Sequence, residues 1–319
     1  MKIEKLTPAF QNYLWGGTKL RDVYGKNCDF DKVAESWELS THPAGESKIA
    51  EGEFTGLTLS EYIAKMGKSV LGSRPTAFEN FPVLIKFIDA KDALSIQVHP
   101  SDEYALRVEG EFGKTEMWYV MDCEPGAFLY FGVNREITKE EFRERIENNT
   151  VLEVLNRVDV HPGDVFFIES GTIHAIGAGI LICEIQQNSN CTYRVYDYDR
   201  RGADGKPREL HIEKALEVSK LTPSDTADKQ GKAEKISGGT RKPLASCKYF
   251  TTEKLEVFGE MTLTAVEESF LSLIVLTGQA AIFGPDNTVN AKAGDSIFIP
   301  AGTGQVTVTG DCQVILTKV

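Results

Sequence analysis

Short apolar segments dominate the chain, and most of them have the length and composition of β-strands. They are rich in Val, Ile, Phe and Tyr and are separated by Gly, Pro or Asp, as in residues 81–90, 116–125, 126–133, 164–170 and 180–188. Apolar runs bounded by turn residues are typical of strands, and their close spacing favours an antiparallel sandwich or barrel. We therefore predict a mainly β protein.

Helical periodicity is confined to three stretches, residues 58–67, 137–158 and 210–220. Thr138 followed by Glu141 fits a capping box, which predicts that a helix begins there. We expect these few helices to be insertions on a β scaffold.

A polar stretch divides the chain. Residues 221–245 contain Pro and Gly-Gly and show neither helical nor strand periodicity, which indicates a linker. We expect an N-terminal domain over 1–220, with the helical insertions, and a C-terminal β domain over 246–319. A chain of 319 residues with 41% hydrophobic content is long enough to form two cores.

One segment occurs twice. Residues 163–174 (GDVFFIESGTIH) align without a gap to residues 294–305 (GDSIFIPAGTGQ), with six of twelve positions identical. The pattern predicts a turn, a strand, a second turn and a strand start whose first side chain points inward. That side chain is His174 in the first copy and Gln305 in the second, so we expect two similar β-barrels, of which the first is able to bind a metal.

The spacing of Gly163, Gly171 and His174 resembles the second signature motif of the cupin superfamily. Glu169 departs from that motif, which usually has proline there, whereas Pro300 occupies the position in the second copy. The resemblance implies two cupin-type jelly-roll barrels, with a metal site in residues 1–220 and none in residues 246–319.

Residues with metal-binding chemistry gather in two of the predicted strands. Alternation along a strand sends Gln97 and His99 to the same face. Glu116 begins an aromatic strand, with Lys114 on its face, and an ionised carboxylate there requires a charge partner if it is buried. With His174, these groups form an N/O ligand set suited to zinc, with room for a water or a substrate oxygen.

The same two histidines and one carboxylate also describe a non-haem iron site, so these residues leave the metal open. The other three histidines precede a proline or begin a helix, and we predict that they are structural: His42, His161 and His211.

Six motifs resemble, in the same order, those of type I mannose-6-phosphate isomerases. They are residues 15–17 (WGG), 34–40 (AESWELS), 84–86 (LIK), 95–100 (SIQVHP), 113–116 (GKTE) and 171–175 (GTIHA). The resemblance covers about residues 10–200. The chain is similar to the compact bacterial branch, because it lacks most of the helical insertion between the glutamate and the second histidine.

This resemblance implies an aldose–ketose isomerase that interconverts mannose 6-phosphate and fructose 6-phosphate. It implies one Zn²⁺ per chain, held by Gln97, His99, Glu116 and His174. Arg194 would be the catalytic arginine, and Lys86 and Lys114 would line the same pocket. Zinc and Arg194 would stabilise the enediolate formed as a proton moves between C2 and C1, and one of the three cations would hold the phosphate.

Two other functions remain open at this point. An Fe(II) cupin oxygenase could use His99, Glu116 and His174, although Gln97 as a fourth ligand would reduce the open positions that oxygen activation needs. A non-catalytic sugar-binding cupin would keep the pocket but has no need of a full ligand set.

Composition narrows the expected partners. A net charge of −12 and a pI near 5.1 argue against a nucleic acid or an anionic membrane as partner and leave a small phosphosugar substrate. The sequence begins with no apolar signal segment, so we expect a cytoplasmic protein, either a monomer or a homodimer. The six cysteines form no C-x-x-C pair, and we expect reduced thiols.

Overall fold

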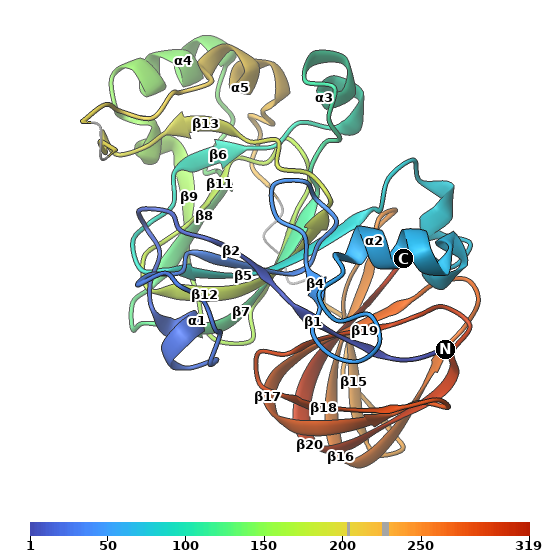
Figure 1. Cartoon of the computed structure of the whole chain (residues 1–319). Helices are drawn as coiled ribbons and strands as arrows, with labels where there is room; N and C mark the ends of the chain where they lie inside the picture. Colours follow the sequence, from blue (N-terminus) through green and yellow to red (C-terminus); the bar gives the residue numbers. More distant parts are fainter. Residues whose placement is uncertain (203–204, 225–229) are drawn as a thin grey trace.

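The computed structural model describes residues 1–202, 205–224 and 230–319, and these residues form three antiparallel sheets (Figure 1). The six-stranded sheet has the order β10 (Val165–Ile168), β7 (Glu116–Cys123), β12 (Ile180–Gln187), β5 (Val83–Ala90), β3 (Glu35–Leu39), β2 (Ala9–Gln11). The five-stranded sheet has the order β13 (Tyr193–Tyr196), β6 (Ile96–Val98), β11 (His174–Ile176), β8 (Phe128–Val133), β9 (Leu155–Asp159). The prediction of a mainly β protein is confirmed.

The nine-stranded sheet contains the C-terminal part of the chain. Its order is β14 (Glu234–Ile236), β15 (Gly239–Ser246), β16 (Thr251–Ala265), β20 (Gly304–Lys318), β17 (Leu271–Phe283), β19 (Ser296–Ile299), β1 (Glu4–Thr7), β4 (Lys48–Ile49), and β18 (Thr288–Lys292) pairs with β17. Along this path of described strands, β14 and β4 are the two ends, so the sheet is not closed into a barrel by hydrogen bonds.

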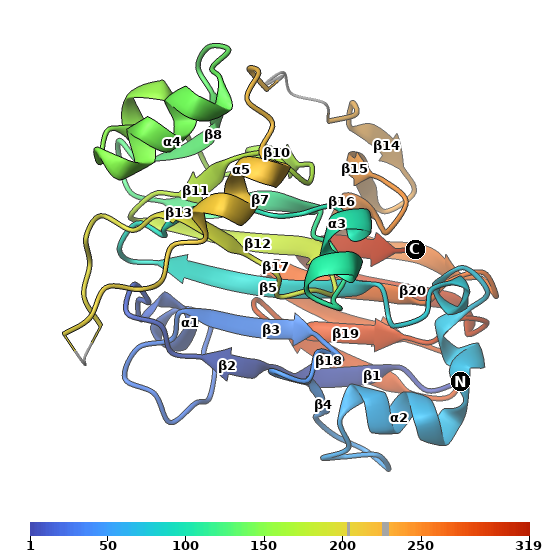
Figure 2. The same ribbon diagram turned by 90° about the horizontal axis from the view of Figure 1, so that it is seen from above.

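The six-stranded sheet is the middle layer of the molecule. One face packs on the five-stranded sheet, with Trp118 and Leu129 in the shared core. The other face packs on the nine-stranded sheet, with Ile185 and Phe298 in a second core, and Figure 2 shows these two sheets lying next to each other. Every residue of β5 and β12 is therefore buried. Burial on both faces explains why these strands read as nearly continuous apolar runs.

Three helices occur in the predicted stretches: α2 (Leu59–Met66), α4 (Lys139–Glu147) and α5 (Ile212–Val218). Thr58 and Glu61 form a full capping box at α2. At α4 only half of the box is present: Thr138 accepts the Glu141 N–H, while the Glu141 carboxylate pairs with Arg135 and Arg145. Two further helices were not predicted, α1 (Lys19–Asp22) and α3 (Asp102–Val108).

The helical prediction was wrong for the end of the second stretch. Val151–Val154 form a short 3-10 turn, and Leu155–Asp159 form strand β9, which pairs with β8. The spacing of apolar residues there suits one helical turn, but edge pairing with β8 determines the conformation of the rest.

The internal repeat is also a structural repeat. Gly163 and Gly294 have φ values of 96° and 94°, and each is the third residue of a turn that ends at the following aspartate. Asp164 Oδ2 accepts the N–H of His161 at 2.7 Å, and Asp295 Oδ2 accepts that of Lys292 at 2.9 Å. The turns lead into β10 and β19. The copies differ at their last position, because His174 is buried whereas Gln305 is exposed and does not point inward as predicted.

The two ends of the chain meet in the nine-stranded sheet. Strand β1 pairs with β19, and the chain then passes through Pro8 to β2, which pairs with β3 in the six-stranded sheet. Proline cannot donate to a ladder, which suits the crossing between sheets. The stretch expected as a linker, 221–245, includes β14 and most of β15, and residues 225–229 lie outside the described part.

A buried ion pair joins the two halves where these sheets meet. Lys26 Nζ lies 2.6 Å from Glu38 Oε1 and donates to the Gly294 carbonyl at 2.5 Å. Ser296 Oγ donates to the Glu38 carbonyl at 3.0 Å. Burial raises the pKa of Glu38, and the neighbouring ammonium opposes that effect. Loss of the lysine would therefore leave an uncompensated buried carboxylate.

In the described residues all six cysteines are free thiols, as predicted. The described helices include none with the length and apolarity needed to cross a membrane.

Lys26→Met is expected to lower the free energy of unfolding by about 3 kcal/mol, because it removes one partner of a buried pair. The double variant Lys26→Met/Glu38→Gln should recover part of the loss, since the buried charge is gone. Lys19→Met, which removes an exposed pair with Asp122, is the matched control and should cost less than about 1 kcal/mol. Urea unfolding measures all three, and a Lys26→Met variant as stable as the control would contradict this account.

Candidate metal centre

Three side chains of the kinds that bind metals come together at the ends of strands. Glu116 is the first residue of β7, His174 is the first of β11, and His99 follows the last residue of β6. All three are at most 1% exposed. Ile96 and Val98 pack in the core under α4 and α5, so alternation turns Gln97 and His99 to the opposite face, towards the six-stranded sheet.

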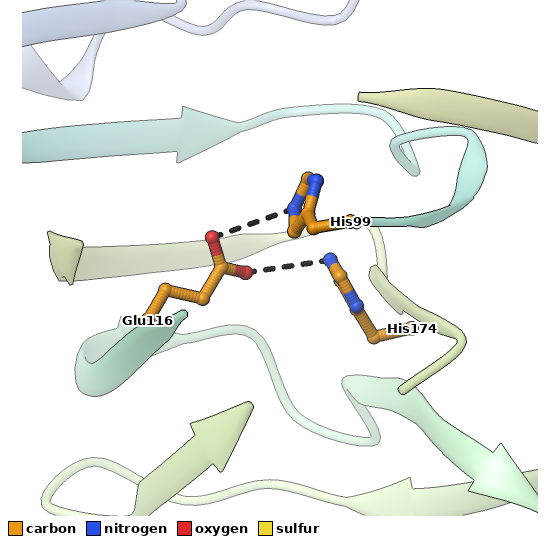
Figure 3. A group of neighbouring side chains, drawn as sticks. All are labelled: His99, Glu116 and His174. Carbon is orange, nitrogen blue, oxygen red and sulfur yellow. Dashed lines mark ion pairs between the residues drawn. The ribbon is translucent and has the colours of Figure 1, made fainter. Parts of the chain in front are cut away.

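The Glu116 carboxylate faces both imidazoles, with one oxygen towards each ring (Figure 3). Its Oε2 is 3.5 Å from His99 Nε2, and its Oε1 is 3.3 Å from His174 Nε2. The ring centroids of the histidines are 4.7 Å apart. Gln97, the register partner of His174, places its amide nitrogen 3.3 Å from His174 Nε2. Four of the predicted site residues are thus in direct contact.

Backbone carbonyls orient both imidazoles. His99 Nδ1 lies 3.0 Å from the Cys191 carbonyl oxygen, and His174 Nδ1 lies 2.8 Å from that of Thr172. A carbonyl oxygen only accepts, so each Nδ1 carries the proton and each Nε2 presents a lone pair to Glu116. Metal-bound histidines are held by contacts of this kind.

No proton lies between the Glu116 carboxylate and the two imidazoles. Burial lowers the pKa of His99 to about 3 and also lowers that of His174, so both rings are neutral at physiological pH. Burial alone would raise the pKa of Glu116, but the charge of Lys114 opposes it, and the pKa lies well below its usual value. Lone pairs of two imidazoles and an ionised carboxylate therefore face one another.

The arrangement fits a divalent cation. His99 Nε2 and Glu116 Oε1 are buried and have no hydrogen-bond donor among the described residues, although such groups are nearly always satisfied. Each of the three residues offers a ligand atom, and these atoms lie within 4.8 Å of one another. Ligands about 2.1 Å from a tetrahedral zinc are roughly 3.4 Å apart, close to the separations of 3.3 and 3.5 Å found here.

Two lysines and a glutamate extend the site across the middle sheet. Lys114 Nζ is 2.8 Å from Glu116 Oε2 and 3.8 Å from Glu184 Oε2. Lys86 Nζ is 3.6 Å from Glu184 and 3.4 Å from Glu35. Burial opposes the charge of Lys114, but Glu116 and Glu184 outweigh it and raise its pKa, so Lys114 stays protonated.

The sequence analysis did not identify Glu184 as a site residue. Burial raises the pKa of this carboxyl, and Trp118 Nε1 donates to its Oε1 at 2.9 Å. A signal was available, since Glu184 interrupts an apolar run that is buried on both faces.

Arg194 lies beside the cluster, on the strand next to Gln97. It pairs with Gln97 across β13 and β6, which places it on the same face in the next strand. Its Nη1 donates to the Glu209 carbonyl at 2.8 Å, and its buried Nε has no acceptor among the described residues. His42, His161 and His211 lie outside the cluster.

A jelly-roll scaffold with a buried His–Glu–His cluster places this protein among the cupins that can hold a metal. The sequence profile for the catalytic domain of type I phosphomannose isomerase matches residues 3–120, and that for the mannose-6-phosphate isomerase cupin domain matches residues 240–319.

Whole-chain relatives agree with these profiles. The chain is 39% identical to the mannose-6-phosphate isomerase ManA of Bacillus subtilis over 97% of its own length and 96% of that protein. The crystal structure of the Bacillus subtilis mannose 6-phosphate isomerase, at 37% identity, superposes with a TM-score of 0.92 over the whole of both chains. A zinc-bound mannose 6-phosphate isomerase, at 18% identity, shares the fold with a TM-score of 0.80 over 99% of each chain. The chain belongs to the mannose-6-phosphate isomerase family and is an isomerase.

His174→Ala is expected to weaken zinc binding by more than about 100-fold, because it would remove one of the three groups placed to contact an ion directly. His161→Ala is the matched control, since that histidine is 80% exposed and lies outside the cluster. Competition with a chromophoric chelator measures both affinities on metal-free protein. Equal affinities in the two variants would contradict the assignment of the centre.

Proposed function

We propose that this chain is a zinc-dependent isomerase that interconverts mannose 6-phosphate and fructose 6-phosphate through an enediolate. The observation that carries the proposal is the convergence of unprotonated lone pairs from His99, His174 and Glu116 in a chain of this family. Family membership favours an isomerase over the oxygenase and the sugar-binding protein that the sequence left open.

Four side chains would hold the ion: Gln97, His99, Glu116 and His174. Gln97 would use its amide oxygen, which requires a half-turn of the amide from the orientation in which its nitrogen faces His174. When bound, zinc supplies a Lewis acid that stabilises negative charge developing on a substrate oxygen. The zinc in the related zinc-bound mannose 6-phosphate isomerase supports the choice of metal.

Lys114 would contribute a second positive charge at the reacting end of the sugar. It is protonated, buried and 2.8 Å from Glu116, so it can donate a hydrogen bond to an oxyanion without first acquiring a proton. Lys86 pairs with Glu35 and Glu184 and is connected to the cluster through Glu184, which also lies near Lys114. We assign Lys86 to maintaining the charge balance around Glu184.

The phosphate requires a cation other than these two lysines, because both are buried in ion pairs with carboxylates. Next to Arg194 lie Arg200 and Arg208, which share the carboxylate of Asp197 at 2.5 Å each. Asp197 is 5% exposed, and the two arginines outweigh burial and lower its pKa. Two guanidinium groups on one buried carboxylate leave excess positive charge, which suits a phosphate.

The backbone around Arg200 supports a binding role. Tyr198 and Asp199 have φ values of 55° and 52°, a conformation that non-glycine residues seldom adopt and that often marks a functional site. Arg200 lines a cavity of about 420 Å³ together with Trp15. Arg194 is near Arg200 and Arg208 and is also the register partner of Gln97, so a phosphate held here would direct the sugar towards the metal centre.

The test of the proposed function is isomerisation of mannose 6-phosphate in ²H₂O by wild type and by Arg194→Ala. The wild type should form fructose 6-phosphate carrying some deuterium at C1, since a base exchanges the transferred proton with solvent. Arg194→Ala should keep its zinc and lose roughly 100- to 1,000-fold in kcat, because an oxyanion donor is removed. No conversion by the zinc-loaded wild type would overturn the proposed function, and loss of zinc in the variant would make Arg194 structural.

Arg208→Ala is expected to raise the KM for mannose 6-phosphate roughly 10- to 100-fold, the usual effect of losing a charged hydrogen bond. Inhibition by inorganic phosphate should weaken in parallel, while the zinc content is unchanged. Arg143→Ala is the matched control, because Arg143 pairs with Glu213 on the surface. If KM and phosphate inhibition are unchanged in Arg208→Ala, the phosphate binds elsewhere and this assignment is wrong.

A further inference from the structure

A hydrogen bond connects the nine-stranded sheet to the loops that present the metal centre. Tyr249 lies in the turn between β15 and β16, and its hydroxyl donates to Asp102 Oδ2 at 2.6 Å. Asp102 is the first residue of α3 and follows His99 by three positions. Burial, then the contact with Asp102, raises the pKa of Tyr249, so the hydroxyl keeps its proton and acts as the donor.

The other oxygen of Asp102 joins two loops. Oδ1 accepts the Gly113 N–H at 3.0 Å and the Gln187 side-chain amide at 2.9 Å. Gln187 Oε1 in turn accepts the N–H of Thr115 at 2.8 Å, directly before Glu116. One carboxylate thus connects the segment that follows His99 to the segment that precedes Glu116.

These two segments are too closely packed to move independently. A Cβ on Gly113 would lie 2.3 Å from the carbonyl carbon of Ser101 and 2.4 Å from the Asp102 nitrogen. Lys114 N–H donates to the Pro100 carbonyl at 3.0 Å. The orientation of the Asp102 carboxylate therefore affects how His99 and Glu116 are placed relative to each other.

We propose that Tyr249 is a positioning residue through which the second β unit sets the metal affinity of the centre. This inference rests on the proposed metal centre. The hydroxyl fixes one oxygen of Asp102 so that the other holds the Gly113 and Gln187 donors, and these keep the two loops at the spacing a metal requires. Supporting groups of this kind tune metal affinity without touching the ion.

Tyr249→Phe tests the proposal, because it removes only the hydroxyl. We expect the zinc dissociation constant of metal-free protein, measured by chelator competition, to rise roughly 3- to 10-fold, somewhat less than for a group that contacts a ligand directly. The matched control is Thr252→Val, three positions after Tyr249, which removes a buried hydroxyl that contacts Thr317. The control should leave the zinc affinity unchanged even if its melting temperature falls.

Asp102→Asn shows whether the effect passes through the carboxylate. If it does, adding Tyr249→Phe to Asp102→Asn weakens zinc binding no further than Asp102→Asn alone. Wild-type affinity in Tyr249→Phe, or equal weakening in Thr252→Val, would overturn the positioning role while the proposed function stands. Failure of the wild type itself to bind zinc would overturn both.

Discussion

The structure depends on keeping the carboxylate of Glu116 ionised in a fully buried position. Desolvation opposes that charge, and the Lys114 ammonium at 2.8 Å offsets the penalty. The same burial keeps His99 and His174 neutral, because an imidazolium there would be desolvated and close to Lys114. A site with one permanent anion and two neutral lone pairs attracts a metal cation and gives it nitrogen and oxygen ligands.

This electrostatic arrangement requires a layered fold. The middle sheet has another sheet packed on each of its faces, so it can remove a charged group from water while neighbouring strands supply its partners. The ligand-type residues stand at the ends of β6, β7 and β11, where both ladder pairs and the adjoining loops set their spacing. The second β unit covers the other face of the middle sheet and approaches these loops at Tyr249.

Much of this could be predicted from the sequence. Alternation places Gln97 and His99 on one face, and the repeat identifies His174, because both patterns are local consequences of strand geometry. The sequence could not predict the contact between Asp102 and Tyr249, which are 147 positions apart, or the pairing of β1 with β19. Such contacts depend on how whole sheets pack. The prediction of a helix around residues 150–158 was wrong for the same reason. The apolar spacing there fits one turn, but pairing with β8 makes β9 a strand.

The most direct test of the central claim measures the metal content of the purified protein beside its mannose 6-phosphate isomerase activity, before and after chelation and zinc add-back. The account predicts about one zinc per chain, loss of activity with the metal, and recovery on addition of one equivalent. Full activity in protein stripped of metal would contradict the account, and so would stoichiometric zinc that persists in a His99→Ala/His174→Ala variant.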